Sequence, residues 1–145
     1  MSRWFLLFIV AISFPVCAVD EKEERAIANM VKNSSLSREE ILEDYKTGCA
    51  SGHNLRMRIC AAYGFYEADV DLNDTYKEIK GKLNKEQKEM LIKAQRAWIT
   101  YRDATCLYET SFGGSADGLY FSSCRETLTR ERTKRLIENS PNQEE

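Results

Sequence analysis

The apolar residues of this chain recur every three to four positions over most of its length, a spacing typical of amphipathic helices. The only prolines are Pro15 and Pro141, so no proline interrupts the helical pattern between them. The pattern predicts two short helices followed by three long ones, over residues 21–32, 37–45, 55–83, 84–108 and 120–138. No segment alternates as a β-strand does. We therefore expect an all-α fold, a small helical bundle with a C-terminal helix.

Sequence signals at the helix ends support this division. Ser37 with Glu40, and Asn84 with Gln87, have the spacing of a capping box, in which two side chains bond free N–H groups at a helix start. The connection at Leu83 is short, so the two helices beside it should form a long antiparallel hairpin with their apolar stripes facing each other. The expected stripes are Leu55, Ile59, Ala62, Tyr63, Tyr66, Val70, Tyr76 and Leu83 on one helix, and Leu91, Ala94, Trp98, Tyr101, Thr105 and Tyr108 on the other.

Polar residues lie among those apolar positions, and we interpret them as a structural network. Asp69 and Asn73 are four residues apart on the first hairpin helix, while Gln95 and Arg102 flank Trp98 on the second. A buried charge without a partner is strongly destabilising. We therefore expect an ion pair of Asp69 with Arg102 between the helices. Asn73 and Gln95 should complete its hydrogen bonds, with Trp98 in the core beside it.

Residues 1–18 have the features of a secretion signal peptide: basic Arg3, an apolar stretch too short to span a membrane, and small residues before a cleavage site after Ala18. Cys17 raises the alternative of a lipoprotein, but the residues before it fit a lipidation site poorly. No later segment predicts a membrane span. We expect a periplasmic or secreted protein with N-terminal short helices over 19–47, a main helical domain over 48–138 and a disordered tail over 139–145.

Four cysteines remain once Cys17 leaves with the signal peptide: Cys49, Cys60, Cys106 and Cys124. An even number of cysteines in an oxidising compartment predicts a fold stapled by disulfides. Four cysteines allow three pairings. We favour Cys49 with Cys60 and Cys106 with Cys124, because each pair is close in sequence across one turn region. A four-cysteine zinc site is the alternative, although the usual C-x-x-C pairs are absent.

Charge and residue types argue against several function classes. The signal peptide holds one of the 21 basic residues and none of the 23 acidic ones, so its removal changes the net charge from −2 to −3, which does not favour nucleic acid. His53 is the only histidine and has no free thiol to pair with, and Ser115 has no evident base. Asp69, Asp71 and Asp74 lack the spacing of a calcium loop. We expect no enzyme, no metal and no cofactor.

Several spaced motifs then suggest a family. The most specific string is Gln95-Arg96-Ala97-Trp98-Ile99, Tyr101-Arg102-Asp103 and Cys106. Supporting positions are Cys60, Asp69, Leu72, Asn73 and Tyr76 before it, and Gly114, Ser115, Cys124, Leu128, Thr129 and Arg132 after it. From about Cys49 to Leu136 the chain resembles the lysozyme inhibitor LprI N-terminal domain family. The resemblance implies a small helical, extracytoplasmic bacterial domain whose namesake activity is inhibition of lysozyme.

We accordingly expect a protein partner, a lysozyme or another wall hydrolase, that is blocked by insertion of a loop. Lysozyme cleaves its substrate with two carboxylates that flank a sugar cleft, so an inhibitor needs only to plug that cleft. Two cysteine-anchored loops are candidates; one contains Gly48, Ser51 and His53, and the other contains Gly113, Gly114, Ser115 and Asp117. The alternative is a periplasmic immunity or envelope-maintenance protein with a non-lysozyme partner.

Overall fold

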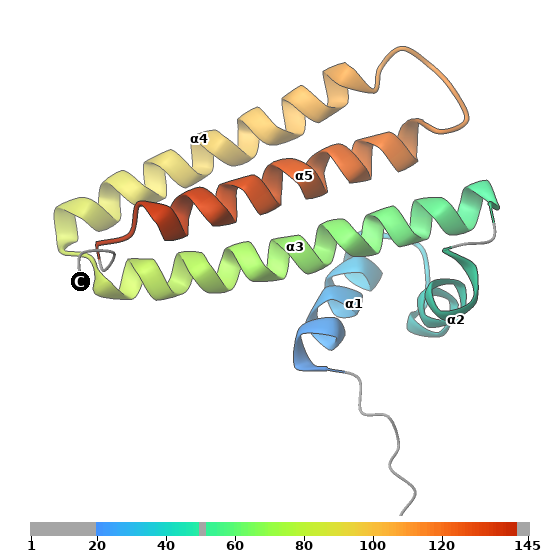
Figure 1. Cartoon of the computed structure of the whole chain (residues 1–145), viewed down its shortest axis with the longest axis horizontal. Helices are drawn as coiled ribbons and strands as arrows, with labels where there is room; N and C mark the ends of the chain where they lie inside the picture. The colour runs from blue at the N-terminus through green and yellow to red at the C-terminus, as the bar shows by residue number, and fades with distance from the viewer. Residues whose placement is uncertain (1–19, 50–51, 142–145) are drawn as a thin grey trace, which may run out of the picture.

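The computed structural model describes residues 20–49 and 52–141, in which the chain forms helices with short connections (Figure 1). The elements are α1 (Glu21–Asn33), α2 (Arg38–Gly48), α3 (Asn54–Lys82), α4 (Lys85–Glu109) and α5 (Asp117–Glu138). No strand occurs in the described residues, and the predicted all-α class is confirmed. The predicted signal peptide with its cleavage site after Ala18, the loop residue Ser51 and the end of the predicted tail, 142–145, lie outside these ranges.

The helix ends follow the capping signals closely. In both predicted capping boxes the first side chain accepts from the backbone N–H three residues on, and that residue's side chain accepts in return: Ser37 with Glu40, and Asn84 with Gln87. The two boundaries next to the candidate loops differ from the prediction. Gly48 is the last residue of α2 and Asp117 is the first of α5, so both are helical, and the loops between the helices are shorter than expected.

α3 is buried on two sides, where the sequence pattern predicted a single stripe. The side toward α1 and α2 contributes Ile59, Tyr63 and Val70 to a core with Ala26, Ile27, Met30 and Ile41. The side toward α4 and α5 buries Phe65, Ala68, Leu72 and Ile79. Leu55, predicted in the core, is exposed. A helix buried on both sides carries apolar residues in two phases, so one stripe describes only part of it.

α5 packs along α3, and α4 lies against α5 (Figure 1). The predicted hairpin is present in its connection and direction, because α3 and α4 run antiparallel and meet at Leu83 and Asn84. Its packing differs, since α5 takes the place beside α3 that was expected for α4. Gly64 leaves room for the Glu126 side chain of α5: a Cβ atom at position 64 would lie 2.5 Å from its carboxylate.

α4 turns a different face inward from the one predicted. Its buried residues are Gln95, Arg102 and Cys106, whereas Tyr101 and Tyr108 are 58% and 70% exposed. The expectation that the two tyrosines lie in the core is therefore wrong. The buried face of α4 is held by a polar network and a disulfide, so the apolar periodicity alone indicated the wrong orientation of the helix.

Both disulfides link consecutive helices. Cys49 bonds Cys60 and so joins the end of α2 to α3, and Cys106 bonds Cys124 and joins α4 to α5. These are the pairings favoured from the sequence, and they leave no thiolate for the zinc alternative. None of the helices in the described ranges is long and apolar enough to cross a membrane.

Replacement of Cys106 and Cys124 together by serine should lower the free energy of unfolding by about 3 kcal/mol, because the disulfide restricts a loop of moderate length in the unfolded chain. Urea unfolding followed by far-UV circular dichroism measures the change. The double replacement of Cys49 and Cys60 serves as a comparison in which the α4–α5 crosslink is intact. An unchanged midpoint for the first variant would contradict the prediction.

Candidate functional site

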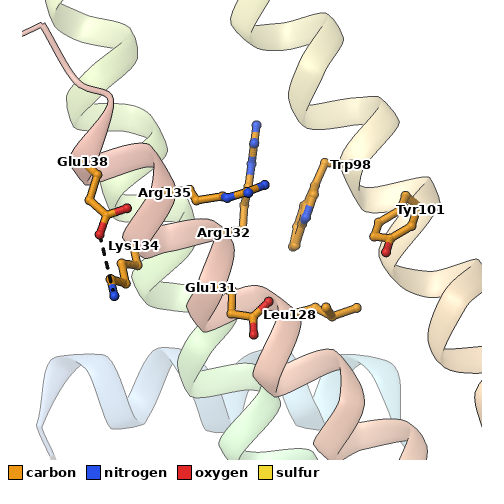
Figure 2. Close-up of a pocket in the computed structure, with 8 residues that line it drawn as sticks. All are labelled: Trp98, Tyr101, Leu128, Glu131, Arg132, Lys134, Arg135 and Glu138. Carbon is orange, nitrogen blue, oxygen red and sulfur yellow. Dashed lines mark ion pairs between the residues drawn. The ribbon is translucent and has the colours of Figure 1, made fainter.

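Trp98 forms one wall of a cavity of about 470 Å³ between α4 and α5 (Figure 2). The other lining residues are Tyr101 from α4, and Leu128, Glu131, Arg132, Lys134, Arg135 and Glu138 from α5. The Cζ atom of Arg132 lies 5.8 Å from the Trp98 ring centroid, and its Nε donates a 3.1 Å hydrogen bond to Gln95 Oε1. Gln95 thus pairs with α5, and not with the Asp69 and Asn73 group as expected.

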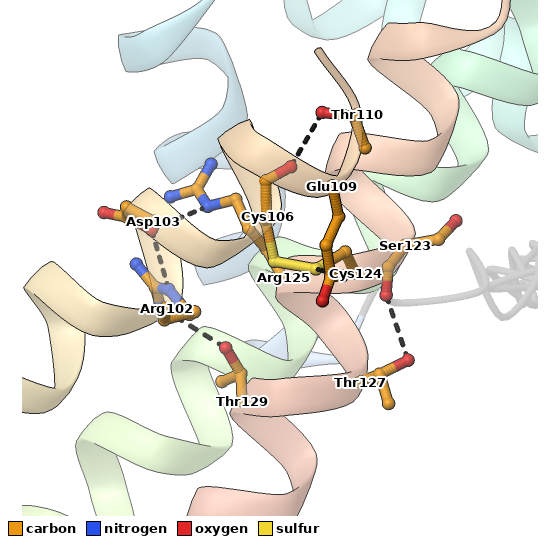
Figure 3. The surroundings of a disulfide bond; sticks show 10 residues. All are labelled: Arg102, Asp103, Cys106, Glu109, Thr110, Ser123, Cys124, Arg125, Thr127 and Thr129. Atoms are coloured by element: carbon orange, nitrogen blue, oxygen red, sulfur yellow. Dashed lines mark hydrogen bonds and ion pairs between the residues drawn. A yellow bond between two sulfur atoms is a disulfide. The ribbon is translucent and has the colours of Figure 1, made fainter. Parts of the chain in front are cut away.

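The Arg102 side chain joins three helices, and Figure 3 shows it beside Asp103 of α4 and Thr129 of α5. It is 4% exposed, and its Nη1 lies 3.5 Å from Asp69 Oδ1 on α3 and 3.3 Å from Thr129 Oγ1 on α5. Its Nε donates to Asp103 Oδ1 at 2.8 Å. Asn73 donates to Asp69 Oδ2 at 2.9 Å. The structure therefore brings Asp69, Asn73 and Arg102 together, and adds Asp103 and Thr129 to the group.

A second guanidinium, that of Arg125 on α5, extends this network. Its Nε donates to the same Asp103 oxygen at 3.1 Å, and its Cζ lies 3.7 Å from the Phe65 ring centroid. Arg102 faces the same ring at 5.0 Å. Burial lowers the pKa of Arg125, although Asp103 acts in the opposite direction, and a guanidinium keeps its proton in either case. One carboxylate and one aromatic ring thus stabilise two cations.

The sequence interpretation did not include four members of this polar core: Asp103, Arg125, Thr129 and Arg132. The three on α5, followed by Leu136, are spaced by three or four residues, as positions on one helix face are. That face points toward α3 and α4. A search for hydrophobic periodicity does not detect this face, because most of its members are polar. The spacing of its arginine and threonine residues could have indicated it.

The polar core has the properties of a structural element. Within the described residues, every buried side-chain nitrogen and oxygen has a hydrogen-bond partner, as a polar network that fixes the positions of helices requires. In the same ranges His, Cys, Asp and Glu side chains nowhere gather in threes. Two of the three aspartates considered for calcium pair with α1, Asp71 with Lys22 and Asp74 with Arg25, and the third, Asp69, pairs with Arg102 on α4.

The start of α3 and the loop between α4 and α5 lie at the same end of the bundle (Figure 1). Arg58 in the first part of α3 donates from its guanidinium to the Ser115 carbonyl in the loop between α4 and α5. Gly113 in this loop has a φ of +90°, a conformation that favours glycine, and Gly114 is exposed. His53 is also exposed and precedes α3 without a side-chain capping bond. The contact of Arg58 with Ser115 therefore holds the second loop against the first part of α3.

Large apolar side chains are exposed beside the second loop. Tyr108 and Phe112 are 70% and 78% exposed, and their ring centroids are 5.8 Å apart. Leu107 and Tyr120 are also exposed, and both lie within the segment that the Cys106–Cys124 disulfide closes. We call these four residues and the 110–116 segment the loop-end surface. The sequence interpretation missed it, because Tyr108 was placed in the core. Exposed aromatic side chains on a rigid base are typical of protein-binding surfaces.

The fold and the site define a small all-α protein with two disulfides, a paired polar core and an exposed aromatic end. Residues 48–136, more than half of the chain, match the family described as lysozyme inhibitor LprI, so the chain belongs to the LprI family and the predicted resemblance is confirmed. An uncharacterized protein of Rhizobium meliloti (strain 1021) is 36% identical over 104 residues, which cover 59% of this chain and 75% of that protein. No solved structure matches the chain.

Replacement of Arg102 by methionine should lower the free energy of unfolding by about 2 kcal/mol, because Asp69 and Asp103 lose their shared cation. This loss of stability is smaller than is usual for breaking a fully buried ion pair, because both carboxylates are partly exposed to water. Thermal or urea unfolding measures it. Arg96→Met is the matched control, because Arg96 is exposed on the same helix and should change stability by less than about 0.5 kcal/mol. Equal effects of the two replacements would contradict a role for the network.

Proposed function

We propose that the protein is an exported inhibitor that binds a peptidoglycan-cleaving enzyme, such as a lysozyme, and blocks its cleft. The observation that carries this proposal is the family match over residues 48–136. That segment contains both disulfides, Cys49–Cys60 and Cys106–Cys124, and both candidate loops. Disulfides persist in oxidising compartments, which agrees with export through the signal peptide expected at residues 1–18. An inhibitor of this kind acts by binding and needs no reactive group of its own.

The loop-end surface is the part of the described chain best suited to enter an enzyme cleft. Tyr108 and Phe112 offer large aromatic area with few rotatable bonds, as residues that dominate binding energy commonly do. The crosslink of Cys106 with Cys124 closes the base of this segment, and the bond from Arg58 to Ser115 holds it against α3. A surface held in this way loses less conformational entropy when it binds.

The charge of the 110–116 segment also fits a lysozyme cleft. The catalytic carboxylates of lysozyme flank the bound sugar chain. The segment itself contains no Asp or Glu, so its tip brings no like charge to the two carboxylates, and Glu109 and Asp117 lie at its two ends. The net charge of about −3 expected for the processed chain adds only a weak attraction to a basic enzyme. Shape and apolar contact therefore supply most of the proposed affinity.

The oxidised, processed protein should slow the clearing of a bacterial cell suspension by lysozyme, measured as turbidity against time. Replacement of both Tyr108 and Phe112 by alanine should weaken inhibition at least about tenfold, because two exposed aromatic anchors are lost. Met90→Ala is the control, since Met90 is an exposed apolar residue of the same helix about 27 Å along it from Tyr108.

Two results would count against this proposal. Unimpaired clearing at a large molar excess over several lysozyme types would exclude lysozyme inhibition, and copurification with a different envelope protein would then favour the immunity or maintenance role. Full inhibition by the double alanine variant would instead retain the function and exclude the loop-end surface as its site.

A further inference from the structure

The cavity between α4 and α5 holds two guanidinium groups without a carboxylate partner. Among the described residues, no carboxylate oxygen lies within 4.0 Å of the Arg132 or Arg135 nitrogens. Arg132 donates to the neutral amide of Gln95, while the third cation of the cavity, Lys134, pairs with Glu138 at 3.7 Å. Burial lowers the pKa of Arg132, and the positive charge of Arg135 lowers it further. Arg132 is partly buried and the exposed Arg135 lies beside it, and two like charges side by side favour binding of an anion.

The rest of the lining indicates what kind of molecule would carry that anion. Figure 2 shows both guanidinium groups extending from α5 toward Trp98 on α4, with Tyr101 farther along the same helix. The Tyr101 side chain is 58% exposed, so its ring is free to meet a ligand. Leu128 is the single aliphatic lining residue, which is too little apolar wall for a lipid chain. The C–H groups of a sugar ring pack well on a flat aromatic face, and sugar hydroxyls suit a polar rim.

We propose that this cavity binds one anionic sugar unit of an envelope polysaccharide. The acidic group of the sugar, a carboxylate or a phosphate, accepts hydrogen bonds from Arg132 and Arg135, since guanidinium groups bind both anions in a bidentate manner. The ring packs against Tyr101 beside Trp98, and the Glu131 carboxylate at the rim accepts bonds from hydroxyls. A volume of about 470 Å³ lies within the range of small-molecule sites.

This cavity is separate from the surface proposed to block an enzyme. It is lined on α5 by residues 128–138, the half of the helix far from Cys124 and the loop. One molecule could therefore bind the polysaccharide and an enzyme together. The two proposals do not depend on each other, because sugar binding is measured with no enzyme present.

Tryptophan fluorescence offers a direct measurement, because Trp4 leaves with residues 1–18 and Trp98 is then the only tryptophan. Titration of the oxidised, processed protein with N-acetylmuramic acid and with glucose 6-phosphate tests the carboxylate and the phosphate separately. A saturable change is expected with at least one of them, and binding about tenfold weaker with neutral N-acetylglucosamine. Lactate and inorganic phosphate, which carry the anion without the ring, should also bind about tenfold more weakly.

Variants assign the response to the two arginines. The double replacement Arg132→Gln with Arg135→Gln should weaken binding of the acidic sugar at least about tenfold. Arg135→Gln alone should also weaken binding, and because Arg135 is exposed, this variant should fold as the wild type does. Arg96→Gln removes an exposed arginine of α4 outside this cavity and should bind as the wild type does. Equal binding of neutral and acidic sugars, equal binding of the free anions, or unchanged binding by both arginine variants would overturn the proposal.

Discussion

The buried guanidinium of Arg102 is the constraint on which the arrangement of the long helices depends. Its charge cannot leave water without partners, and α4 alone supplies one hydrogen-bond acceptor, Asp103, and the Trp98 ring. The remaining partners come from Asp69 on α3 and Thr129 on α5, so the charge is satisfied only when the three helices meet in one register. Arg125 shares both Asp103 and the Phe65 ring, and the same register therefore serves two cations.

This polar core explains why α5, and not α4, packs along α3. The inward face of α5 carries arginine and threonine side chains that contact both α3 and α4. Gly64 on α3 leaves room for the Glu126 side chain of α5. α4 is held to α5 mainly by Arg102, by the Arg132 contacts with Gln95 and Trp98, and by the Cys106–Cys124 bond. Contacts through long polar side chains keep these helices apart, and the cavity beside Trp98 lies in that space.

The loop-end surface and the cavity beside Trp98 lie at different positions along the bundle. One end combines the start of α3, the loop between α4 and α5, the disulfides and the exposed aromatic side chains, which together suit contact with a folded protein. The cavity toward the other end combines aromatic and cationic side chains, which suit a small anionic ligand. The chain belongs to a family described as lysozyme inhibitors, and the inhibition proposed above requires a stable surface more than a reactive group. A paired, crosslinked core provides that stability without using the exposed residues.

The sequence by itself determined the all-α class, the capping boxes at Ser37 and Asn84 and the family, and it favoured the two disulfide pairings that the structure has, because helix periodicity, caps and cysteine spacing are local properties. The contact of Asp69 with Arg102 also followed, since a buried charge demands a partner. The tertiary structure alone decided that α5 lies beside α3, that Gln95 binds Arg132, and that Tyr108 faces outward. These features depend on which helices meet, and a polar inward face carries no hydrophobic pattern that would reveal the choice.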